Sequence, residues 1–471
     1  MDKTCKRRTQ FYADKVILAP MVRANTLPFR LLCLEYGADL VYTEELIDYR
    51  LSKCRRLTNK VLGTVDFVDE HGEIVLRTSP SEKDQLILQL GSNNPERAVK
   101  AAKLVAQDIA GVDFNFGCPK SFSLSGGMGA ALLEKPDLIV ALLTRSVECL
   151  DLPITCKIRI LPQLERTLEL VKKIEQCGVS AIAVHGRTKD QRQGHDNQDH
   201  VLREISKVIS IPMIANGGSN HIRSYSDILK FKDKTSASSV MIARSAIKNP
   251  SIFKSDNNLN PIETVIERFV KLSVKYDTFV SSIKYVLQTM MASGHYGQEV
   301  LQKFHAASDY GKLCDVYNLT EWYDKNKISQ SKNDFYDAEQ MLNKQLEKCI
   351  SDKRASLSEQ GIKEFVCDSI PYSGRIYGPS SPKSQLNDYV NQNKRNNVTH
   401  PVIDVFKLSD QKKNQFYCSM IFNGVFYLNK SHSISKKGAE HATSMLVCER
   451  LGLVKLDEYK TKVNACNKNI A

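Results

Sequence analysis

Eight short runs of apolar and β-branched residues, with longer amphipathic segments between them, recur through the first 250 residues and constrain the fold most. The runs are VILAPM (16–21), LVYTEE (40–45), LILQLGS (86–92), VDFNFGC (112–118), ITCKIRI (154–160), AIAVHGRT (181–188), IPMIANGG (211–218) and SVMIARSA (239–246). Strand-like runs that alternate with helical segments indicate βα units and a parallel sheet. Eight such units predict a (β/α)₈ TIM barrel in the α/β class. A doubly wound sheet is the alternative, but the Gly-rich fingerprint after its first strand is missing.

The rest of the chain departs from this alternation. Residues 61–78 are predicted to form a hairpin inserted between the second and third barrel strands. Residues 262–312 lack strand signals and predict a helical domain, whereas residues 361–456 follow an α-β-β-β-α order. The segment between them is rich in charged and polar residues and is typical of one exposed helix or a mobile linker. The predicted domains are a barrel (1–255), a helical domain (256–323), a linker (324–360) and a C-terminal domain (361–460).

The charge of the chain is concentrated near its C-terminus. The net charge is +13, and residues 375–471 hold 15 Lys and Arg against 7 Asp and Glu, a net +8. An excess of this kind favours a polyanionic partner such as nucleic acid. A solvated surface that charge keeps soluble is the alternative at this point.

The cysteine spacing and the hydropathy indicate the cellular compartment of the protein. The 13 cysteines form no CxxC pair, so their spacing fits neither a zinc site nor a disulfide framework, and no metal is expected. Reduced thiols are typical of a cytosolic or nuclear protein, and we expect a cytoplasmic one. No run of 18 apolar residues suggests a transmembrane helix, and the first residues lack the apolar stretch of a secretory signal.

Chemically capable side chains gather at the ends of the predicted strands. In a TIM barrel the functional residues come from these C-terminal ends and from the loops after them. The candidates are Gln89 after strand three, Asn115 and Cys118 after strand four, Lys157 and Arg159 in strand five, His185 and Arg187 after strand six, Asn216, Gly217 and Gly218 after strand seven, and Ala243 and Arg244 after strand eight. Each residue alone is more often structural, but their joint placement predicts a site.

The turns after strands seven and eight predict a phosphate site. Glycines such as Gly217 and Gly218 let backbone N–H groups approach a phosphate closely. Arg244 adds a bidentate partner for the charge. These two loops are also the usual phosphate site of the fold. Outside a barrel the same Asn-Gly-Gly would be only a turn; within one it favours a phosphorylated cofactor.

Cys118 lies in NFGCPK, ahead of the Gly-rich stretch SLSGGMGAALL. The proline after the thiol stiffens the loop, and Gly117 allows a tight turn. The Gly-rich stretch is typical of a mobile loop that opens and closes over a substrate. On these residues alone, a buried structural cysteine stays the leading alternative.

The motifs LAPM, LQLGS, NFGCPK with GGMGAALL, CKIR, VHGRT, ANGG and IARSA occur in this order and resemble the tRNA-dihydrouridine synthases over residues 14–310. The resemblance implies that NADPH reduces bound FMN, which then passes hydride to C6 of a uracil in tRNA. It implies FMN contacts from Pro20, Met21, Val22, Gln89, Lys157, His185, Asn216, Gly217, Gly218, Ala243 and Arg244. It also implies uracil contacts from Asn115 and Arg187, and Cys118 as the acid that protonates C5.

The C-terminal unit resembles a double-stranded RNA-binding domain through SPKSQLNDYVNQ and SISKKGAEHATSMLVCERLGL. The resemblance implies phosphate contacts from Lys436 and Lys437, with Arg375 as a further contact. Glu440 departs from the family pattern, since a basic residue is common at its position. A protein-interaction version of the domain is the alternative.

The fusion of these two domains implies an enzyme that modifies the uridine at position 20 of the tRNA D-loop, and separately we expect a monomer. Two other functions stay open on the sequence. One is an FMN barrel enzyme that acts on a free pyrimidine, like dihydroorotate dehydrogenase. The other is a non-catalytic RNA-binding protein with a relict barrel.

Overall fold

The computed structural model divides the chain into two compact units, residues 1–67 with 75–330 and residues 68–74 with 331–471. The described residues are 8–70, 72–192, 194–294, 296–328, 338–362, 364–368, 381–393, 398–409, 414–430, 433 and 435–454. Among them, no helix combines the length and the apolar character needed to cross a membrane.

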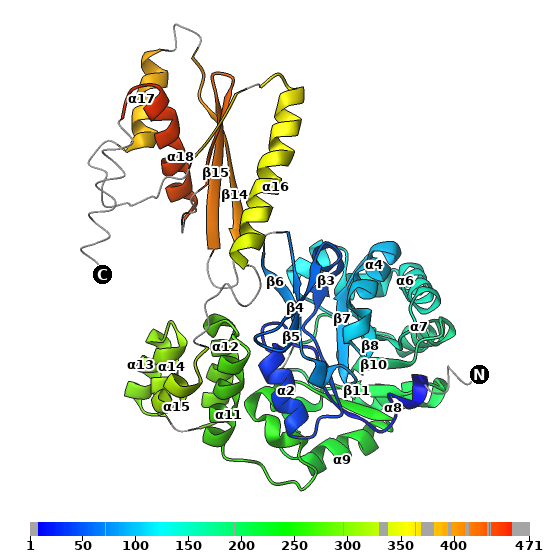
Figure 1. Ribbon diagram of the computed structural model, residues 1–471. Coiled ribbons are helices and arrows are strands. Elements are labelled where there is room, and N and C mark those ends of the chain that lie inside the picture. Colours follow the sequence, from blue (N-terminus) through cyan, green and yellow to red (C-terminus); the bar gives the residue numbers. More distant parts are fainter. Residues whose placement is uncertain are drawn as a thin grey trace. The chain divides into compact units, whose positions relative to one another are not determined.

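Eight parallel strands close into a barrel in the first unit (Figure 1). The strands are β1 (Val16–Leu18), β2 (Leu40–Tyr42), β7 (Leu86–Gly91), β8 (Gly111–Phe116), β9 (Ile154–Arg159), β10 (Ala181–His185), β11 (Met213–Asn216) and β12 (Ser239–Ile242). Each pairs with the next along the chain, β1 pairs with β12, and β2 with β7 through Val41 and Leu86. The predicted barrel is therefore confirmed, with all eight predicted runs as its strands.

Helices surround the barrel because their apolar faces bury against the outward side chains of the strands. They are α2 (Leu27–Glu35), α4 (Pro95–Val105), α6 (Pro136–Cys149), α7 (Leu164–Gln176), α8 (Asp199–Val208) and α9 (Tyr225–Thr235). Shorter helical turns lie in the loops: α5 (Ser121–Ser125), α10 (Arg244–Lys248), η2 (Ala106–Asp108), η3 (Gly129–Glu134), η4 (Gly218–Asn220) and η5 (Pro250–Phe253).

The predicted hairpin belongs to a three-stranded sheet of β4 (Arg55–Asn59), β5 (Thr64–Val68) and β6 (Ile74–Thr78), which the turn η1 (Pro80–Glu82) follows. Two short elements lead into it, β3 (Leu46–Ile47) and α3 (Asp48–Leu51). Because β3 pairs with Leu90 and Gly91 at the end of β7, the segment after β2 lies at the C-terminal end of the barrel.

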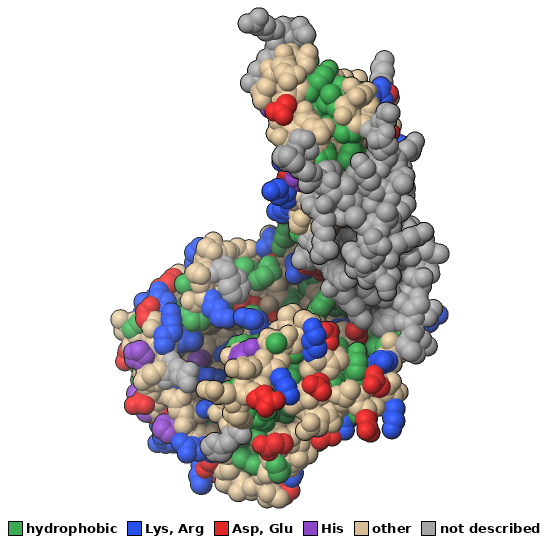
Figure 2. All heavy atoms as spheres, turned by 90° about the vertical axis from the view of Figure 1, so that its left-hand side faces the viewer, with side chains coloured by type: hydrophobic (Ala, Val, Ile, Leu, Met, Phe, Trp, Pro, Cys, Tyr) green, Lys and Arg blue, Asp and Glu red, His purple; other side chains and the backbone are tan. Residues whose placement is uncertain are grey.

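The helical segment of the first unit has no core of its own. It comprises α11 (Ile262–Lys275), α12 (Val280–Met291), α13 (Gln298–Ala306), α14 (Tyr310–Val316) and α15 (Thr320–Asn326). Its buried residues join the cluster that covers the barrel strands, and Phe269 of α11 packs edge-on against Phe29 of α2 at 6.0 Å between ring centroids. Figure 2 views the face with these helices, where Lys and Arg side chains interleave with Asp and Glu.

The second unit holds a four-stranded sheet in the order β13 (Glu364–Asp368), β16 (Val425–Asn429), β15 (Asn414–Phe422), β14 (Val402–Ser409). Helices α17 (Pro382–Gln392) and α18 (Lys436–Arg450) cover one face of this sheet, as the predicted order of elements requires (Figure 1). The three antiparallel strands and two helices confirm the predicted RNA-binding fold. Strand β13, parallel to β16, is an addition that the sequence did not suggest.

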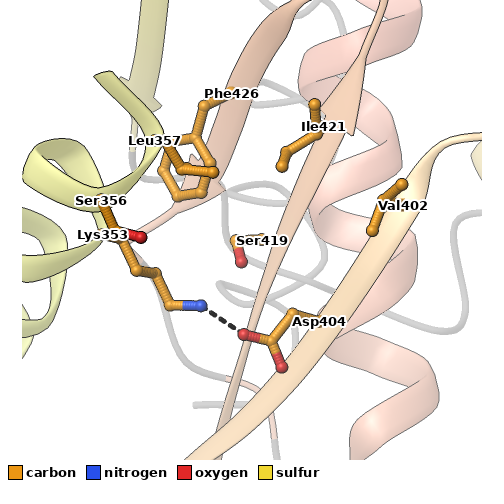
Figure 3. A pocket seen from close by; sticks show the side chains of 8 residues that line it. All are labelled: Lys353, Ser356, Leu357, Val402, Asp404, Ser419, Ile421 and Phe426. Atoms are coloured by element: carbon orange, nitrogen blue, oxygen red, sulfur yellow. Dashed lines mark hydrogen bonds and ion pairs between the residues drawn. The ribbon is translucent and has the colours of Figure 1, made fainter. Parts of the chain in front are cut away.

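The segment expected as a linker contains the 22-residue helix α16 (Ala338–Glu359), which packs on the other face of the same sheet. Ile350 is buried against this face, and Leu357, two turns later, packs beside it. A hollow of about 190 Å³ separates the end of α16 from the sheet, and the Lys353 ammonium pairs with the Asp404 carboxylate at its rim (Figure 3). The sequence did not predict this packing, because only a few apolar residues lie on one face of the helix.

Candidate active site at the C-terminal end of the barrel

The loop after β8 is folded so that it fixes Cys118. The Asn115 side-chain oxygen accepts the backbone N–H groups of Gly117 and Cys118, both at 3.0 Å. The Cys118 carbonyl in turn accepts the N–H of Ala130 at 2.9 Å. Gly129 has φ +59°, and a Cβ there would lie 2.6 Å from that carbonyl, so glycine is required where the Gly-rich stretch returns to the thiol.

The Cys118 thiol is held in its protonated form. Burial raises its pKa above the ordinary value, and the neighbouring Glu45 carboxylate raises it further. A thiol in this state is a poor nucleophile but retains a proton to donate. Glu45 was not among the predicted site residues, although its place at the end of the second strand run was a signal for it.

Gln89 is oriented by a buried carboxylate from the neighbouring strand. Its amide donates to Asp113 at 2.8 Å, and the Thr155 hydroxyl donates to the other oxygen of Asp113 at 2.7 Å. Burial raises the pKa of Asp113 to about 6. Since the amide nitrogen is engaged, the Gln89 oxygen remains as an acceptor, and Asn115 donates to it at 3.5 Å. An acidic residue within the apolar run VDFNFGC was the signal for Asp113.

Several cations surround His185 at the end of β10. Burial lowers the pKa of His185 well below its usual value, and Lys157, Arg159, Arg187 and Arg244 lower it further. The imidazole is therefore neutral at physiological pH. Burial, followed by the charge of Arg159, lowers the pKa of Lys157 to about 8. The site thus combines a neutral imidazole with strong positive potential, which favours an anionic ligand.

Arg187, expected to contact a substrate base, makes several contacts with protein atoms. Its side chain is only 2% exposed. The guanidinium donates to the carbonyls of Gly217 at 3.0 Å and His195 at 2.8 Å, and one terminal nitrogen lies 3.1 Å from the His185 ring nitrogen. These contacts tie the end of β10 to the turn after β11.

The turn after β11 has the backbone expected of an anion cradle. Gly217 has φ +113°, and a Cβ there would lie 2.0 Å from the Asn197 side-chain oxygen. The Asn216 amide is turned inward and donates to the Met241 carbonyl at 2.8 Å. One terminal nitrogen of Arg244 is buried without a partner, as is the Asn197 oxygen. A buried guanidinium nitrogen with a donor to spare is suited to an anionic ligand.

Residues next to Gly217 and Arg244 in the sequence complete the cradle. Gly218 follows Gly217, and a Cβ on it would meet the Phe231 ring at 2.9 Å. Ala243 precedes Arg244 directly after β12. The Ser245 hydroxyl donates to the Ile222 carbonyl at 2.9 Å and thereby joins the two loops.

Pro20, Met21 and Val22 form the half-buried loop after β1. Asn25 fixes the conformation of this loop, because its side-chain amide donates to the carbonyls of Ala19 at 2.8 Å and Tyr42 at 2.7 Å. The loop therefore presents apolar side chains at the same end of the barrel as Cys118.

The RNA-binding candidates lie in the second unit. Lys436 and Lys437 are exposed in the first turn of α18, where the Ser435 hydroxyl caps the helix by accepting the Gly438 N–H at 3.1 Å. Glu440 is neutralised locally by an ion pair with Lys383 of α17. Arg375 lies outside the described residues. Exposed lysines at a helix N-terminus are suited to phosphate groups.

Across the described ranges, no group of three or more His, Cys, Asp and Glu side chains is arranged to hold a metal ion. The cysteines there, Cys118 included, are all free thiols. The titratable groups described at the site are the thiol, the buried carboxyls and the cationic group around His185.

Comparison with known proteins assigns this architecture. The profile of the dihydrouridine synthase (Dus) family matches residues 17–346, and that of the double-stranded RNA binding motif matches residues 382–451. A tRNA-dihydrouridine(20) synthase [NAD(P)+] of Schizosaccharomyces pombe is 39% identical over 65% of this chain and 66% of its own length. The protein of the same name from Saccharomyces cerevisiae is 35% identical over 59% of this chain and 78% of its own.

The barrel and its site thus define a dihydrouridine synthase fold. The chain belongs to the dihydrouridine synthase family and carries a double-stranded RNA-binding motif after the catalytic region.

Proposed function

We propose that this protein is a flavin-dependent tRNA-dihydrouridine synthase that reduces the C5–C6 bond of a uridine in tRNA with NADPH as reductant. Family membership and the names of the yeast relatives support the reaction, and the RNA-binding motif supports the substrate. We further propose position 20 of the D-loop as the target, because both of these relatives carry that position in their names. The proposed enzyme is a cytoplasmic monomer with a catalytic barrel (1–255) and a C-terminal RNA-binding domain (361–460).

The single observation that carries the proposal is a thiol that its surroundings keep protonated, at the mouth of a barrel with a cationic phosphate cradle. Reduction of the C5–C6 bond requires a proton at C5, and Cys118 has one to give. The target base must leave its stack to reach this depth, at a cost of a few kcal/mol.

The residues present fit FMN. The buried nitrogen of Arg244 without an acceptor and the left-handed Gly217 suit its phosphate, together with Asn216, Gly218 and Ala243. Flavin, when bound, supplies hydride chemistry between NADPH and C6 of the uracil. Arg244 and the glycine turn would bind the phosphate and so fix the position of the cofactor.

The remaining site residues orient the reactants. Gln89 would offer an acceptor, and Lys157 a donor, to the bound flavin. Pro20, Met21 and Val22 would pack against the cofactor and exclude water. We assign His185 to the same contact surface, and Arg187 to positioning His185 and Gly217 rather than to the base. Asn115, which fixes the Cys118 turn, stays our candidate for contact with the uracil.

The second unit would hold the tRNA. Lys436 and Lys437 at the start of α18 would contact backbone phosphates, with Arg375 as a further candidate. Such contacts position a substrate without reading its sequence. The target base would then be chosen by the geometry of the tRNA fold.

The test is to compare Cys118→Ala with the control Cys149→Ala, a half-buried thiol at the end of helix α6. We expect Cys118→Ala to retain bound flavin and its NADPH oxidation but to lose dihydrouridine formation in tRNA, measured by mass spectrometry of nucleosides. Cys149→Ala should behave as wild type. Unchanged product in Cys118→Ala would remove the acid assignment, and turnover on free uridine without turnover on tRNA would refute the proposed substrate.

A further inference from the structure

Glu45 is a buried carboxyl at the end of the barrel that the mechanism so far leaves without a task. It lies between β2 and β3 and is almost fully enclosed. One oxygen accepts the Ser123 hydroxyl at 3.5 Å, and the other is buried without a hydrogen-bond partner. That second oxygen lies 2.8 Å from the point where a Cβ on Gly91 would be, so the end of β7 leaves room for it only because residue 91 is glycine. Burial of a carboxyl with one oxygen that has no partner disfavours its charged form and raises its pKa.

The neighbour of this carboxyl is the thiol itself. Glu45 and Cys118 interact as hydrogen-bonding partners, and the buried Ser123 hydroxyl contacts both. Burial raises the pKa of Glu45, as it does that of the thiol. The other charged group that faces Glu45 is Lys120, whose side chain is exposed. Two weak acids thus lie side by side, and burial raises the pKa of each.

The proposed reaction needs a proton at this place in every turnover. When the Cys118 thiol gives its proton to C5, a thiolate remains and must be reprotonated before the next substrate. The loop that returns at Gly129 packs on Cys118 and Ser123 and holds both beside Glu45. The carboxyl of Glu45 is the acidic group that acts on the Cys118 thiol among the described residues.

We propose that Glu45 returns a proton to the Cys118 thiolate after each turnover, with Ser123 holding the carboxyl in place; this rests on the proposed function. The proton passes from the Glu45 carboxyl to sulfur, and the resulting carboxylate takes one proton from solvent. No electrons move in this step, and each turnover consumes the one proton from solvent that reduction of uridine by NADPH requires. Glu45 acts through Cys118 and is a positioning and proton-supplying residue rather than one that touches the base.

The test uses the full-length flavin-loaded enzyme with Glu45→Gln, and Glu44→Gln as a neighbouring control that is half-exposed. With excess NADPH and tRNA, rapid quenching should show a burst of one dihydrouridine per Glu45→Gln enzyme at close to the wild-type rate, because its thiol starts protonated. The following turnovers should slow by about 100-fold or more, the usual range for a lost acid or base. Glu44→Gln should show neither the burst nor the slow phase.

A second readout does not need turnover. Alkylation of Cys118 by iodoacetamide, followed by peptide mass spectrometry, gives the pH at which the thiolate forms. Glu45→Gln should move this midpoint to lower pH, because the charge of the ionised carboxylate is gone, whereas Glu44→Gln should not.

The outcomes separate the two proposals. A wild-type enzyme that makes no dihydrouridine in tRNA overturns the proposed function. An active wild type with a Glu45→Gln variant that lacks the burst and alkylates at the wild-type midpoint overturns the proton relay alone. Loss of the first turnover together with later ones would also overturn it, because that result indicates a structural role.

Discussion

The ion pair between Arg30 and Glu82 ties the loop after β1 to the inserted hairpin, and its loss should be severe. The Arg30 guanidinium donates to the two oxygens of Glu82 at 2.8 and 2.6 Å. It also donates to the carbonyls of Asn25 at 2.7 Å and Arg77 at 2.8 Å. The side chains of Arg30 and Glu82 are 2% and 0% exposed.

Glu82→Gln removes one charge and leaves the other buried. Glutamine can still cap the turn that Ser79 begins, but its NH2 group replaces one of the two oxygens that accept from Arg30, so the change removes the charge and one acceptor. Breaking a buried pair by removing one partner costs about 3–5 kcal/mol. Since a domain is stable by about 5–15 kcal/mol in total, the first unit should lose a large part of its stability.

Urea denaturation followed by tryptophan fluorescence measures this loss. The one tryptophan of the chain, Trp322, packs against the core of the first unit, so its signal reports on that unit. Glu96→Gln is the matched control, because its pair with Arg145 is exposed at 72% and 43% and should leave the midpoint unchanged. A Glu82→Gln unfolding curve that coincides with the curve of Glu96→Gln would refute the reasoning.

Two further predictions concern the cofactor and the RNA. Gly217→Ala should greatly reduce the flavin bound per protein, measured by absorbance, because its Cβ would collide with Asn197; Gly194→Ala, where a Cβ meets nothing within 4 Å, should bind flavin normally. Equal flavin content in the two variants would refute the assignment of the Gly217 turn as the phosphate site. Lys436→Ala with Lys437→Ala should weaken tRNA binding and reduce the slope of log affinity against log salt by about 2. An unaltered slope would place the phosphate contacts elsewhere, and Lys207→Ala on α8 serves as the control.

The periodicity of apolar residues in the sequence was sufficient to predict the barrel architecture. Strand runs such as VDFNFGC and the helical segments between them can form a closed parallel sheet only if every run pairs on both sides, which the barrel satisfies. The predicted barrel also gave the positions of the strand ends and of the loops with Cys118 and Gly217. Residue order alone also predicted the inserted hairpin and the α-β-β-β-α domain, because apolar alternation and turn residues are local signals.

Side-chain partnerships were decided by the tertiary structure alone. Glu45 and Cys118 are 73 positions apart and meet only because β3 pairs with the end of β7. The sequence likewise did not predict that Arg187 donates to the Gly217 carbonyl. It also did not predict that α16 packs on the second face of its sheet. Hydrogen bonds and pKa values depend on distance and burial between residues from different elements, which only the folded chain defines. The sequence by itself thus determined where the site lies, and the tertiary structure decided which side chains act on one another within it.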